Sequence, residues 1–455
     1  MKVTLDGDIA AWADSGLAFL TGRADGPALG PPPGFVTRLL AIAEGLSAGY
    51  PRPRQPLRSV AARPPGPDPG PLALLAERAA IAGLRRRGAV SCGGAARLMR
   101  AGDGWLCVNL PRPDDLDLLP AWLPHAHWPA AAVPGAAAGA GGPGEDVWSV
   151  IAEAIVGGDP DALAERAQLL GLAVAPLPRR APVPAGAAAA GPSVAERRRS
   201  TGNGDVLDGP DHTDPTGRPA GSGGAGPFDG LPVTVRSTGE AAGPDPRHDL
   251  EGVVVADLSS LWAGPVCSRI LQQAGARVIK VESIPRPDGA RRGPAAFFDR
   301  LHAGQESVAL DFAGAGGRAI LRRLLGAVDV VIEGSRPRAL EQLGISALEL
   351  LGISGRRPPG APGPGPARTG PEGGPTVWVS ITGYGREGAG RDKVAFGDDA
   401  AAAGGLVAWD ADGPCFLADA IADPCTGLVA AAATLSALSA GGRWLVDVAL
   451  RDVAA

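Results

Sequence analysis

The segment EGVVVADLSSLWAGPVCSRILQQAGARVIKVES, residues 251–283, shows the architecture of the C-terminal half most clearly. An apolar run ends at Asp257, a helical stretch stops at Gly275, and a second apolar run follows. Short apolar strands separated by helices are typical of a parallel sheet that is covered on both faces. The segment therefore predicts a strand, a helix and a second strand in one sheet.

The same alternation continues to the end of the chain. The later segments predict a helix, a strand, a short helix, a strand, a helix beginning near Asp423, and a final strand; they read GRAILRRLLGA, VDVVIEG, RALEQLG, TVWVSITGYG, TGLVAAAATLSAL and RWLVDVAL. Residues 249–455 are thus expected to form an α/β domain, a Rossmann-like parallel sheet with helices on both faces. Ligands of such sheets bind beyond the carboxyl ends of the strands, at turns such as Asp257–Gly264.

The N-terminal half, residues 1–177, predicts a smaller α+β unit. Its opening stretch reads as a strand or turn region followed by a helix, and AVSCGGAARLMRAGDGWLCVNL reads as a glycine turn and two strands joined at 102–104. Residues 178–248 are rich in Pro and Gly without apolar periodicity, so we expect a linker there, with docking near Phe228–Ser237. A second Pro/Gly-rich stretch, 356–374, predicts a surface loop.

Composition narrows the class of protein. The chain has 455 residues, 45% of them hydrophobic and 20% charged, and a formal net charge of −5 without a basic run, so nucleic acid is not expected as a partner. The five cysteines are dispersed, which favours reduced thiols and a cytoplasmic location. The start MKVTLDGDIAAW predicts no signal peptide, and no apolar run approaches the ~18 residues of a membrane span.

Carboxylates are the remaining candidates for chemistry. The chain has no GxxxxGK[ST] motif and no GxGxxG after a predicted strand, and the pair His125 and His127 lacks further zinc ligands nearby. Asp423 precedes Pro424 and an apolar helix in FLADAIADPCTGLVAA, so the local pattern predicts a helix cap. The alternative is a nucleophile on an activated acyl group, held ionised by the helix N-terminus.

The turn after the first strand is open to two interpretations in the same way. Gly264 lets a backbone approach a ligand, and the following helix offers free N–H groups to an anion. The alternative is a capped turn with Ser259 or Ser260 as the cap.

Several stretches in order resemble the family III CoA-transferases, which include formyl-CoA and carnitine-CoA transferases and the α-methylacyl-CoA racemases. They are DLSSLWAGPVCSRILQQAGARVIKVES, FFDRLHAGQESVALDF, VDVVIEGSRPRAL, VSITGYGREG, IADPCTG and RWLVDVAL, within about 250–455. The resemblance implies that Asp423 is the nucleophile: it takes an acyl group from a CoA thioester and then carries CoA as an aspartyl thioester. Asp419 does not match the family aspartate and is expected to be structural.

The resemblance also implies a CoA-binding set. The turn after the first strand would lie against the nucleotide, whereas a basic motif of many members is replaced here by His302-Ala-Gly-Gln305. The implied CoA-binding residues are Ser260, Leu261, Trp262, Gln305, Arg336 and Lys393, with Arg291, Arg292 and Arg338 as further sources of positive charge.

The N-terminal half resembles a different part of the same family. Its AVSCGG stretch is similar to the glycine loop of the family's small domain, which closes over the acyl-aspartate, so Gly93 and Gly94 are the expected loop residues. A faint internal repeat also relates SGLAFLTGRADGPALG to GGLVAWDADGPCFLAD. We therefore hypothesise that the two halves complement each other in one site.

The implied activity is CoA transfer between an acyl-CoA thioester and a carboxylic acid, by a homodimer without a permanently bound cofactor. A racemase is disfavoured because Ala395-Phe396-Gly397 stands where that branch has its histidine. The alternative is a non-catalytic protein of the same fold that binds CoA thioesters or a partner chain.

Overall fold

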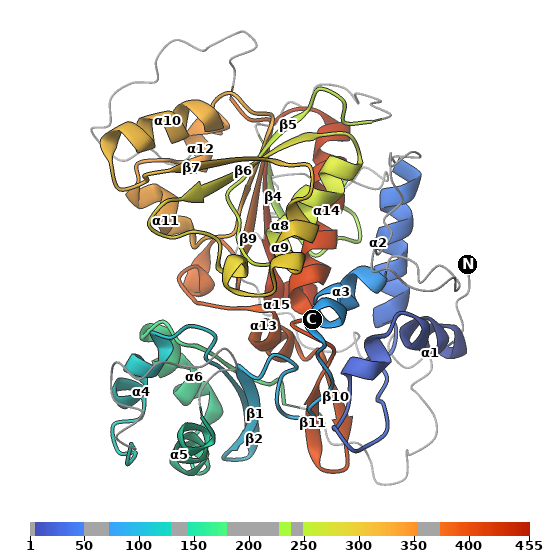
Figure 1. Cartoon of the computed structure of the whole chain (residues 1–455), viewed down its shortest axis with the longest axis vertical. Coiled ribbons are helices and arrows are strands. Elements are labelled where there is room, and N and C mark those ends of the chain that lie inside the picture. The colour runs from blue at the N-terminus through green and yellow to red at the C-terminus, as the bar shows by residue number, and fades with distance from the viewer. Residues whose placement is uncertain (1–4, 50–71, 129–143, 180–226, 238–248, 354–373) are drawn as a thin grey trace, which may run out of the picture. The chain divides into compact units, whose positions relative to one another are not determined.

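A seven-stranded sheet organises the C-terminal half (Figure 1). The computed structural model describes residues 5–49, 72–128, 144–179, 227–237, 249–353 and 374–455. The sheet order is β4-β12-β9-β8-β5-β6-β7, and its neighbours are parallel except the edge pair β4 and β12. The strands are β4 (Thr234–Ser237), β5 (Val254–Asp257), β6 (Arg277–Ser283), β7 (Glu306–Leu310), β8 (Val330–Glu333), β9 (Val377–Thr382) and β12 (Trp444–Ala449).

The sheet confirms the predicted α/β fold and extends it by two strands. The central strands β8 and β9 are buried at every residue, which explains their unbroken apolar sequences. The two strands without a sequence prediction lie at the edges: β7 is largely exposed, and β4 belongs to the segment expected to be a linker. The docking expected near Phe228–Ser237 is therefore an antiparallel edge strand.

Helices cover both faces of the sheet (Figure 1). On one face, α8 (Ala263–Gln273) and α14 (Ala422–Ala440) pack against each other and share a core with Val255, Ile332 and Val379. On the other, α10 (Ala315–Leu325), α11 (Pro337–Gln342) and α12 (Ala347–Leu350) share a core with Val331 and Trp378.

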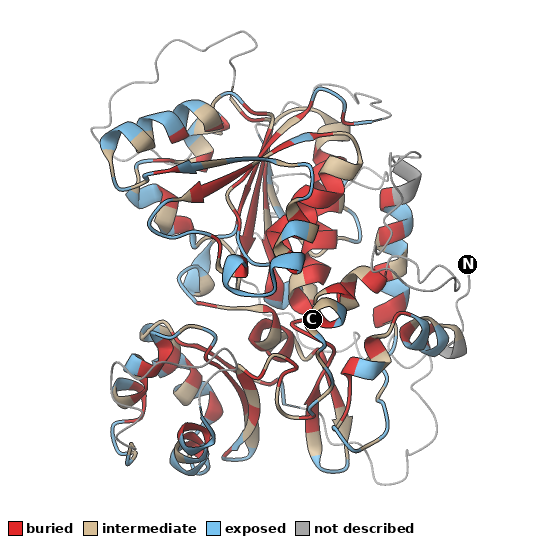
Figure 2. Ribbon diagram, viewed as in Figure 1, coloured by how far each residue is buried: buried red, intermediate tan, exposed pale blue. Residues whose placement is uncertain are grey.

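Helix α14 is buried along nearly its whole length (Figure 2). Its residues are mostly Ala, Leu and Val on all sides, as expected for a helix surrounded by protein. Gly427 permits the closest approach to α8, because a Cβ there would lie 2.6 Å from both the Ala263 carbonyl oxygen and the Val266 Cβ. The start of α14 is thus fixed against the start of α8.

The N-terminal helices complete the core around α14. They are α1 (Leu5–Asp14), α2 (Phe35–Gly49) and α3 (Ala73–Ala82), joined in part by the 3₁₀ turn Leu17–Leu20. Trp12, Leu17 and Phe35 belong to the same core as α8 and α14, and α2 and α3 contact α14. The expected turn region is found over residues 15–34 and the expected helix is α2, but residues 5–14 form a helix rather than a strand or turn.

A small α+β unit lies within residues 96–176. Strands β1 (Ala96–Ala101), β2 (Gly104–Asn109) and β3 (Ala173–Pro176) form an antiparallel sheet, with the β1–β2 turn where the sequence placed it. A separate core with Leu106, Trp122 and Trp148 lies between this sheet and its helices α4 (Asp115–Trp122), α5 (Glu145–Ile155) and α6 (Pro160–Leu169).

The segments of the suggested internal repeat adopt different structures. Residues 17–20 form a 3₁₀ turn, whereas β10 (Val407–Asp410) and β11 (Gly413–Phe416) form a hairpin. They lie next to each other, because Arg23 Nε and Nη2 donate to Asp410 at 2.7 and 2.9 Å. The sequence similarity therefore does not mark a structural repeat.

Residues 1–177 and 226–455 form one compact unit. Most of the predicted linker 178–248 and of the predicted loop 356–374 lies outside the described residues. In the part of the chain that is described, no helix is long and apolar enough to cross a membrane. The five cysteines are free and buried.

Candidate active site

Asp423 lies in the first turn of α14, beyond the sheet edge. The helix begins at Ala422 with Ile421 as its N-cap, so the predicted role of Asp423 as the cap is wrong. Within the residues that the structure describes, its half-buried carboxylate makes no hydrogen bond or ion pair. A carboxylate in this position is available to react with a ligand.

Three further aspartates surround Asp423. Asp398 and Asp399 lie in the first turn of α13 (Gly397–Gly404), and Asp419 lies in the loop that leads into α14. Asn109 Nδ2 donates to Asp399 Oδ1 at 2.7 Å, and the Ala420 N–H donates to Asp398 Oδ1 at 3.0 Å. The site is therefore a group of four carboxyl groups, of which Asp399 and Asp419 are fully buried.

Burial and mutual repulsion raise the pKa values of this group. Burial raises the pKa of Asp423 from 3.8 to about 7, with Asp398, Asp399 and Asp419 adding to the increase and Arg78 opposing it. Burial likewise raises the pKa values of Asp398 and Asp399 to about 7. We expected the helix N-terminus to dominate and keep Asp423 ionised; instead burial dominates, and the carboxyl group holds its proton up to neutral pH.

Arg78, from helix α3 of the N-terminal half, is the cation at this site. Its Nε and Nη2 donate to the two oxygens of Asp419, each at 2.7 Å. The Asp419 side chain has no exposed surface, and its guanidinium partner accounts for its burial. The structural role of Asp419 thus depends on Arg78, which lies far away in the sequence.

The predicted glycine loop lies against this arginine. A Cβ at Gly93 would lie 3.4 Å from Arg78 Nη2, and Gly94 has a φ of 84°, which favours glycine. Gly94 also donates its N–H to Ser91 O at 2.9 Å, closing a turn. The structure therefore brings Gly93 and Gly94 to the neighbourhood of Asp419, next to the segment that carries Asp423.

The loop before α14 has strained backbone. Ala418 and Ala420 have φ values of 56° and 43°, in the left-handed region that L-residues rarely adopt. The N-terminal half holds this loop: Thr21 Oγ1 accepts from the Ala418 N–H at 3.0 Å, and Cys92 Sγ donates to Ala418 O at 3.3 Å. Strain of this kind is common next to functional groups.

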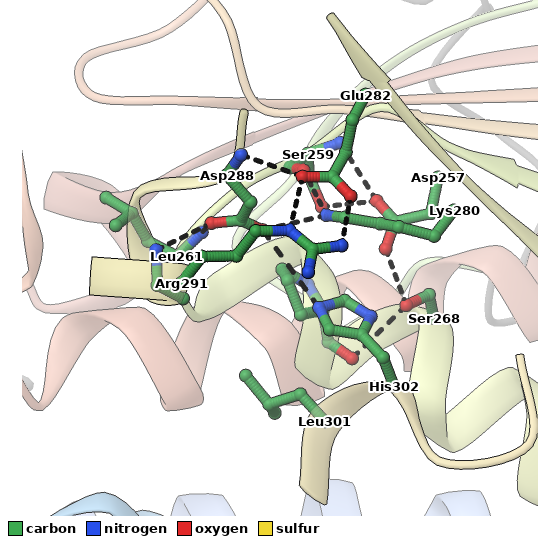
Figure 3. Close-up of polar contacts among 12 residues, drawn as sticks. Asp257, Ser259, Leu261, Ser268, Lys280, Glu282, Asp288, Arg291, Leu301 and His302 are labelled. Carbon is green, nitrogen blue, oxygen red and sulfur yellow. Dashed lines mark hydrogen bonds and ion pairs between the residues drawn. The ribbon is translucent and has the colours of Figure 1, made fainter. Parts of the chain in front are cut away.

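A network of buried polar groups fixes the predicted CoA turn (Figure 3). Asp257 Oδ1 accepts from the N–H of Ser259 at 2.9 Å and from its hydroxyl, and Asp257 Oδ2 accepts from Ser268 Oγ at 2.8 Å. Asp288 Oδ1 accepts from the Leu261 N–H at 2.9 Å, which supports the positive φ of 69° at Leu261.

Lys280 occupies the centre of this network (Figure 3). Its ammonium group is 1% exposed, lies 2.9 Å from Asp288 Oδ2 and donates to Ser259 O at 2.5 Å. Helix α8 begins only at Ala263, with Trp262 as its N-cap and no side-chain cap, so the predicted cap at Ser259 or Ser260 is wrong. Ser259 serves the network instead.

Trp262 lies inside the protein, and Gln305 is half-buried. Trp262 is buried, packs edge-to-face on Phe297 and has the Arg78 guanidinium 5.5 Å from its ring centroid. Gln305 pairs with His302 Nδ1 at 2.8 Å and reaches Ser268 Oγ at 3.4 Å, so it belongs to the network around Lys280.

The positive charge expected for CoA phosphates is present as a group of arginines. Partial burial and the neighbours Arg338, Arg112 and Arg286 lower the pKa of Arg336, which shows that these guanidinium groups lie close together. Arg338 lies 3.5 Å from Asp392, and Lys393 lies over the ring of Tyr384. Arg112, from the turn after β2, connects this arginine group to the small α+β unit.

Arg291 is paired with an acidic residue and does not add a free positive charge to this arginine group. Its Nε and Nη2 donate to Glu282 at 2.9 and 2.6 Å, and this pairing lowers the pKa of Glu282 to about 2. The expectation that Arg291 supplies positive charge to a ligand is therefore wrong. Arg292, the next residue, is exposed.

Sequence reasoning missed Arg78, Asp398, Asp399 and Arg112. The pairing of Arg78 with Asp419 spans 341 positions, so no local spacing indicates it. The two aspartates carry a weaker signal, since acidic residues before an alanine-rich stretch are common in the first turn of a helix.

An open parallel sheet with polar groups gathered beyond the carboxyl ends of its strands is the architecture of α/β proteins that bind ligands at that edge. Residues 250–356 and 375–454 match the family model "CoA-transferase family III". Over these residues, less than half of the chain, the protein is similar to the family III CoA-transferases.

Other proteins are similar to part of the chain. An acyl-CoA transferase of Fusarium pseudograminearum is 30% identical over 212 residues, covering 43% of this chain and 42% of that protein. The succinyl-CoA–D-citramalate CoA-transferase of Chloroflexus aurantiacus is 31% identical over 170 residues, covering 36% and 38%. A solved CAIB/BAIF family protein from Brucella suis is 29% identical, with coverages of 45% and 54% and a TM-score of 0.39. The chain thus spans less than half the length of the two curated relatives.

Proposed function

We propose that the protein transfers CoA between an acyl-CoA thioester and a carboxylic acid, with Asp423 as the nucleophile. The single observation that carries the proposal is the carboxylate of Asp423 at the start of α14, which has no partner among the described residues and lies inside the part of the chain that matches the CoA-transferase family. No cofactor other than the CoA substrate is needed, because each step exchanges one carboxylate or thiolate for another.

In the first half of the reaction, the Asp423 carboxylate attacks the thioester carbonyl. The C–S bond breaks, CoA leaves as a thiolate, and a mixed anhydride remains on Asp423. The thiolate then attacks the Asp423 carbonyl, and the donor acid leaves as its carboxylate. An aspartyl-CoA thioester results, and no proton has been gained or lost.

In the second half, the acceptor carboxylate attacks the aspartyl thioester and releases the CoA thiolate again. The thiolate attacks the acceptor's acyl carbon of the new anhydride, which forms the product acyl-CoA and regenerates the Asp423 carboxylate. The reactive form of Asp423 is the ionised one, so a pKa of about 7 makes the first step faster as pH rises through neutrality.

Substrate binding is assigned to the groups around this carboxylate. Gly93 and Gly94 would close over the acyl-aspartate, and the turn Ser260–Trp262 with Gln305 would shape the CoA site. The CoA phosphates carry negative charge, and the exposed side chains of Arg336, Arg338, Arg286 and Lys393 supply positive charge to hold them, whereas the nearby Arg112 is half-buried and pairs with Asp115.

The halves of the chain contribute jointly in this proposal, with residues 1–177 supplying the glycine loop and Arg78 and residues 249–455 supplying Asp423. A homodimer and a cytoplasmic location remain what the family resemblance and the reduced cysteines favour. The acyl donor and the acceptor are carboxylic acids, and the experiment below screens their CoA thioesters.

The test is chemical capture of the acyl-enzyme. Incubation with a set of acyl-CoA thioesters, followed by hydroxylamine or borohydride and mass spectrometry, is expected to label Asp423. Asp423→Asn and Asp423→Ala should lose the label and reduce turnover by at least about 10³-fold. Asp412→Asn, at an exposed carboxylate in the β10–β11 turn, is the matched control and should keep both.

Two other outcomes have clear meanings. CoA-thioester binding without any label on Asp423 would favour a non-catalytic binding protein or subunit of the same fold. Undiminished transfer by Asp423→Ala would remove the mechanism altogether.

A further inference from the structure

The N-terminal half of the chain contributes Arg78 to the surroundings of Asp423. Arg78 contacts Asp419 with a two-pronged ion pair, lies over Trp262 and packs against Gly93. It does not lie in a motif that the family resemblance singled out. Its contacts join the glycine loop, the CoA turn and the loop that carries the nucleophile.

The position of Arg78 is itself fixed. The preceding residue, Glu77, is buried and accepts from Arg269 Nη1 at 2.7 Å and from Arg300 Nε at 2.6 Å. These arginines belong to α8 and to α9 (Ala295–His302). Glu77 therefore ties helix α3 to α8 and α9, and the next residue, Arg78, is directed at the site.

The Arg78–Asp419 pair holds strained backbone in place. Asp419 lies between Ala418 and Ala420, the two residues with left-handed φ values, and the Asp423 N–H donates to Ala420 O at 2.9 Å. A buried aspartate that lost its guanidinium partner would be an unpaired buried charge, which a loop relieves by rearranging. The start of α14 would move with it.

Arg78 also balances the charge of the carboxyl group cluster. The charged groups that act on Asp423 come from three places: Arg78 on α3, Asp398 and Asp399 on α13, and Asp419 in the preceding loop. The arginine lowers the pKa values of both Asp423 and Asp398, whereas the other carboxyl groups raise that of Asp423.

We infer that Arg78 is a positioning residue for Asp423: it fixes the loop that leads into the nucleophile and places a positive charge beside it. The inference rests on the proposed function for its kinetic consequence. Arg78 touches no reacting atom in this scheme and acts through Asp419 and through its charge.

The test compares Arg78→Gln and Arg78→Lys with the wild-type protein. Arg78→Gln should shift the acid limb of the profile of kcat/KM against pH to higher pH by about one unit. At pH values below the limb, kcat/KM should therefore be about tenfold lower than in the wild-type protein. The substitution should lower kcat while leaving KM for the acyl-CoA within about twofold. Arg78→Lys retains the charge without the two-pronged geometry, so it should restore the pH limb and recover kcat only in part.

Arg23→Gln is the matched control. Arg23 also lies in the N-terminal half and forms a two-pronged pair with an aspartate of the C-terminal half, Asp410, on the hairpin. Its loss should leave the acid limb in place. A folded Arg78→Gln protein with an unshifted limb would overturn the inference, and so would an equal shift in Arg23→Gln.

A direct titration separates this inference from the proposed function. With ¹³C-carboxyl aspartate, the Asp423 resonance is assigned by its loss in Asp423→Asn and followed with pH. Its pKa should rise in Arg78→Gln and stay unchanged in Arg23→Gln, even if the wild-type protein turns over no acyl-CoA. An unchanged Asp423 pKa in Arg78→Gln would refute the role of Arg78 whatever the activity.

Discussion

At the scale of single residues, the site is a compromise between stability and reactivity. Asp423 has no partner among the described residues, and burial favours its protonated form. Because the reactive form is the charged one, the folded protein must hold a destabilising charge whenever it is competent to react. Sites that hold such groups generally gain stability when the group is replaced.

This compromise predicts a pH-dependent stability change in Asp423→Asn. The pKa of Asp423 is higher in the folded protein than the 3.8 of the unfolded chain, so its stabilising contribution is present at low pH and is lost as pH rises from about 4 to about 7. Asn does not titrate, so the variant's advantage should grow over this window, by on the order of 1–3 kcal/mol.

The measurement is thermal unfolding of wild type and Asp423→Asn at pH 5 and pH 8. The variant should gain more at pH 8, whereas the exposed Asp412→Asn should show no such growth. An Asn variant that is equally or less stable at pH 8 than at pH 5, relative to wild type, would contradict the prediction.

At the scale of elements, the contact of α14 with α8 sets the position of the nucleophile. Gly427 lies one turn after Asp423 and touches the backbone of α8, which cannot move aside as a flexible side chain can. The two helices also form one core with the sheet. A change at this contact is transmitted directly to the first turn of α14.

Gly427→Ala should therefore destabilise the protein by about 1–3 kcal/mol and weaken acyl capture at Asp423, because overpacking shifts the helices apart. Gly45→Ala is the matched control: Gly45 lies in α2 with nothing within 4 Å of an added Cβ. It should be neutral or stabilise by up to about 1 kcal/mol. Chemical denaturation measures both, and equal effects of the two changes would exclude the packing argument.

The sequence predicted those elements whose environment is uniform. Strands such as β8 and β9 are buried on both faces, so their apolar runs are unambiguous. The edge strands β4 and β7 were missed because exposed strands lack such apolar runs. Residues 5–14 were misassigned because their apolar residues do not recur with a clear helical period.

The candidate site was predicted only where a local motif exists. IADPCTG indicated Asp423, and SCGG indicated Gly93 and Gly94. Arg78 and Arg112 escaped because their roles follow from contacts across the fold, and Arg291 misled because its partner Glu282 is recognisable only in the structure.

At the scale of the whole molecule, the two halves share one hydrophobic core. Trp12, Leu17 and Phe35 of the N-terminal half lie in the same core as Leu428 and Val429 of α14. Separation of the halves would expose this apolar surface, which a soluble monomer does not tolerate over a large area.

A fragment of residues 227–455, which retains β4, is therefore expected to be less stable and to show no acyl capture on its own. Co-expression with residues 1–177 should restore both properties. Thermal unfolding, size-exclusion chromatography and the hydroxylamine assay measure this. A fragment that alone captures acyl groups as well as the full chain would refute the shared site.

The buried Glu77 has a consequence for the order of folding. Its partner Arg269 lies 192 positions later in the chain, and the partner of Arg78 lies 341 positions later. Contacts of such large sequence separation slow folding, since long loops must close before any contact forms. During synthesis the N-terminal helices must wait, with an unpaired acid and an uncovered apolar face, until the sheet has been made. A chaperone that binds unfolded chains should therefore increase the yield of folded protein. No incomplete chain would hold Asp423 in its final surroundings.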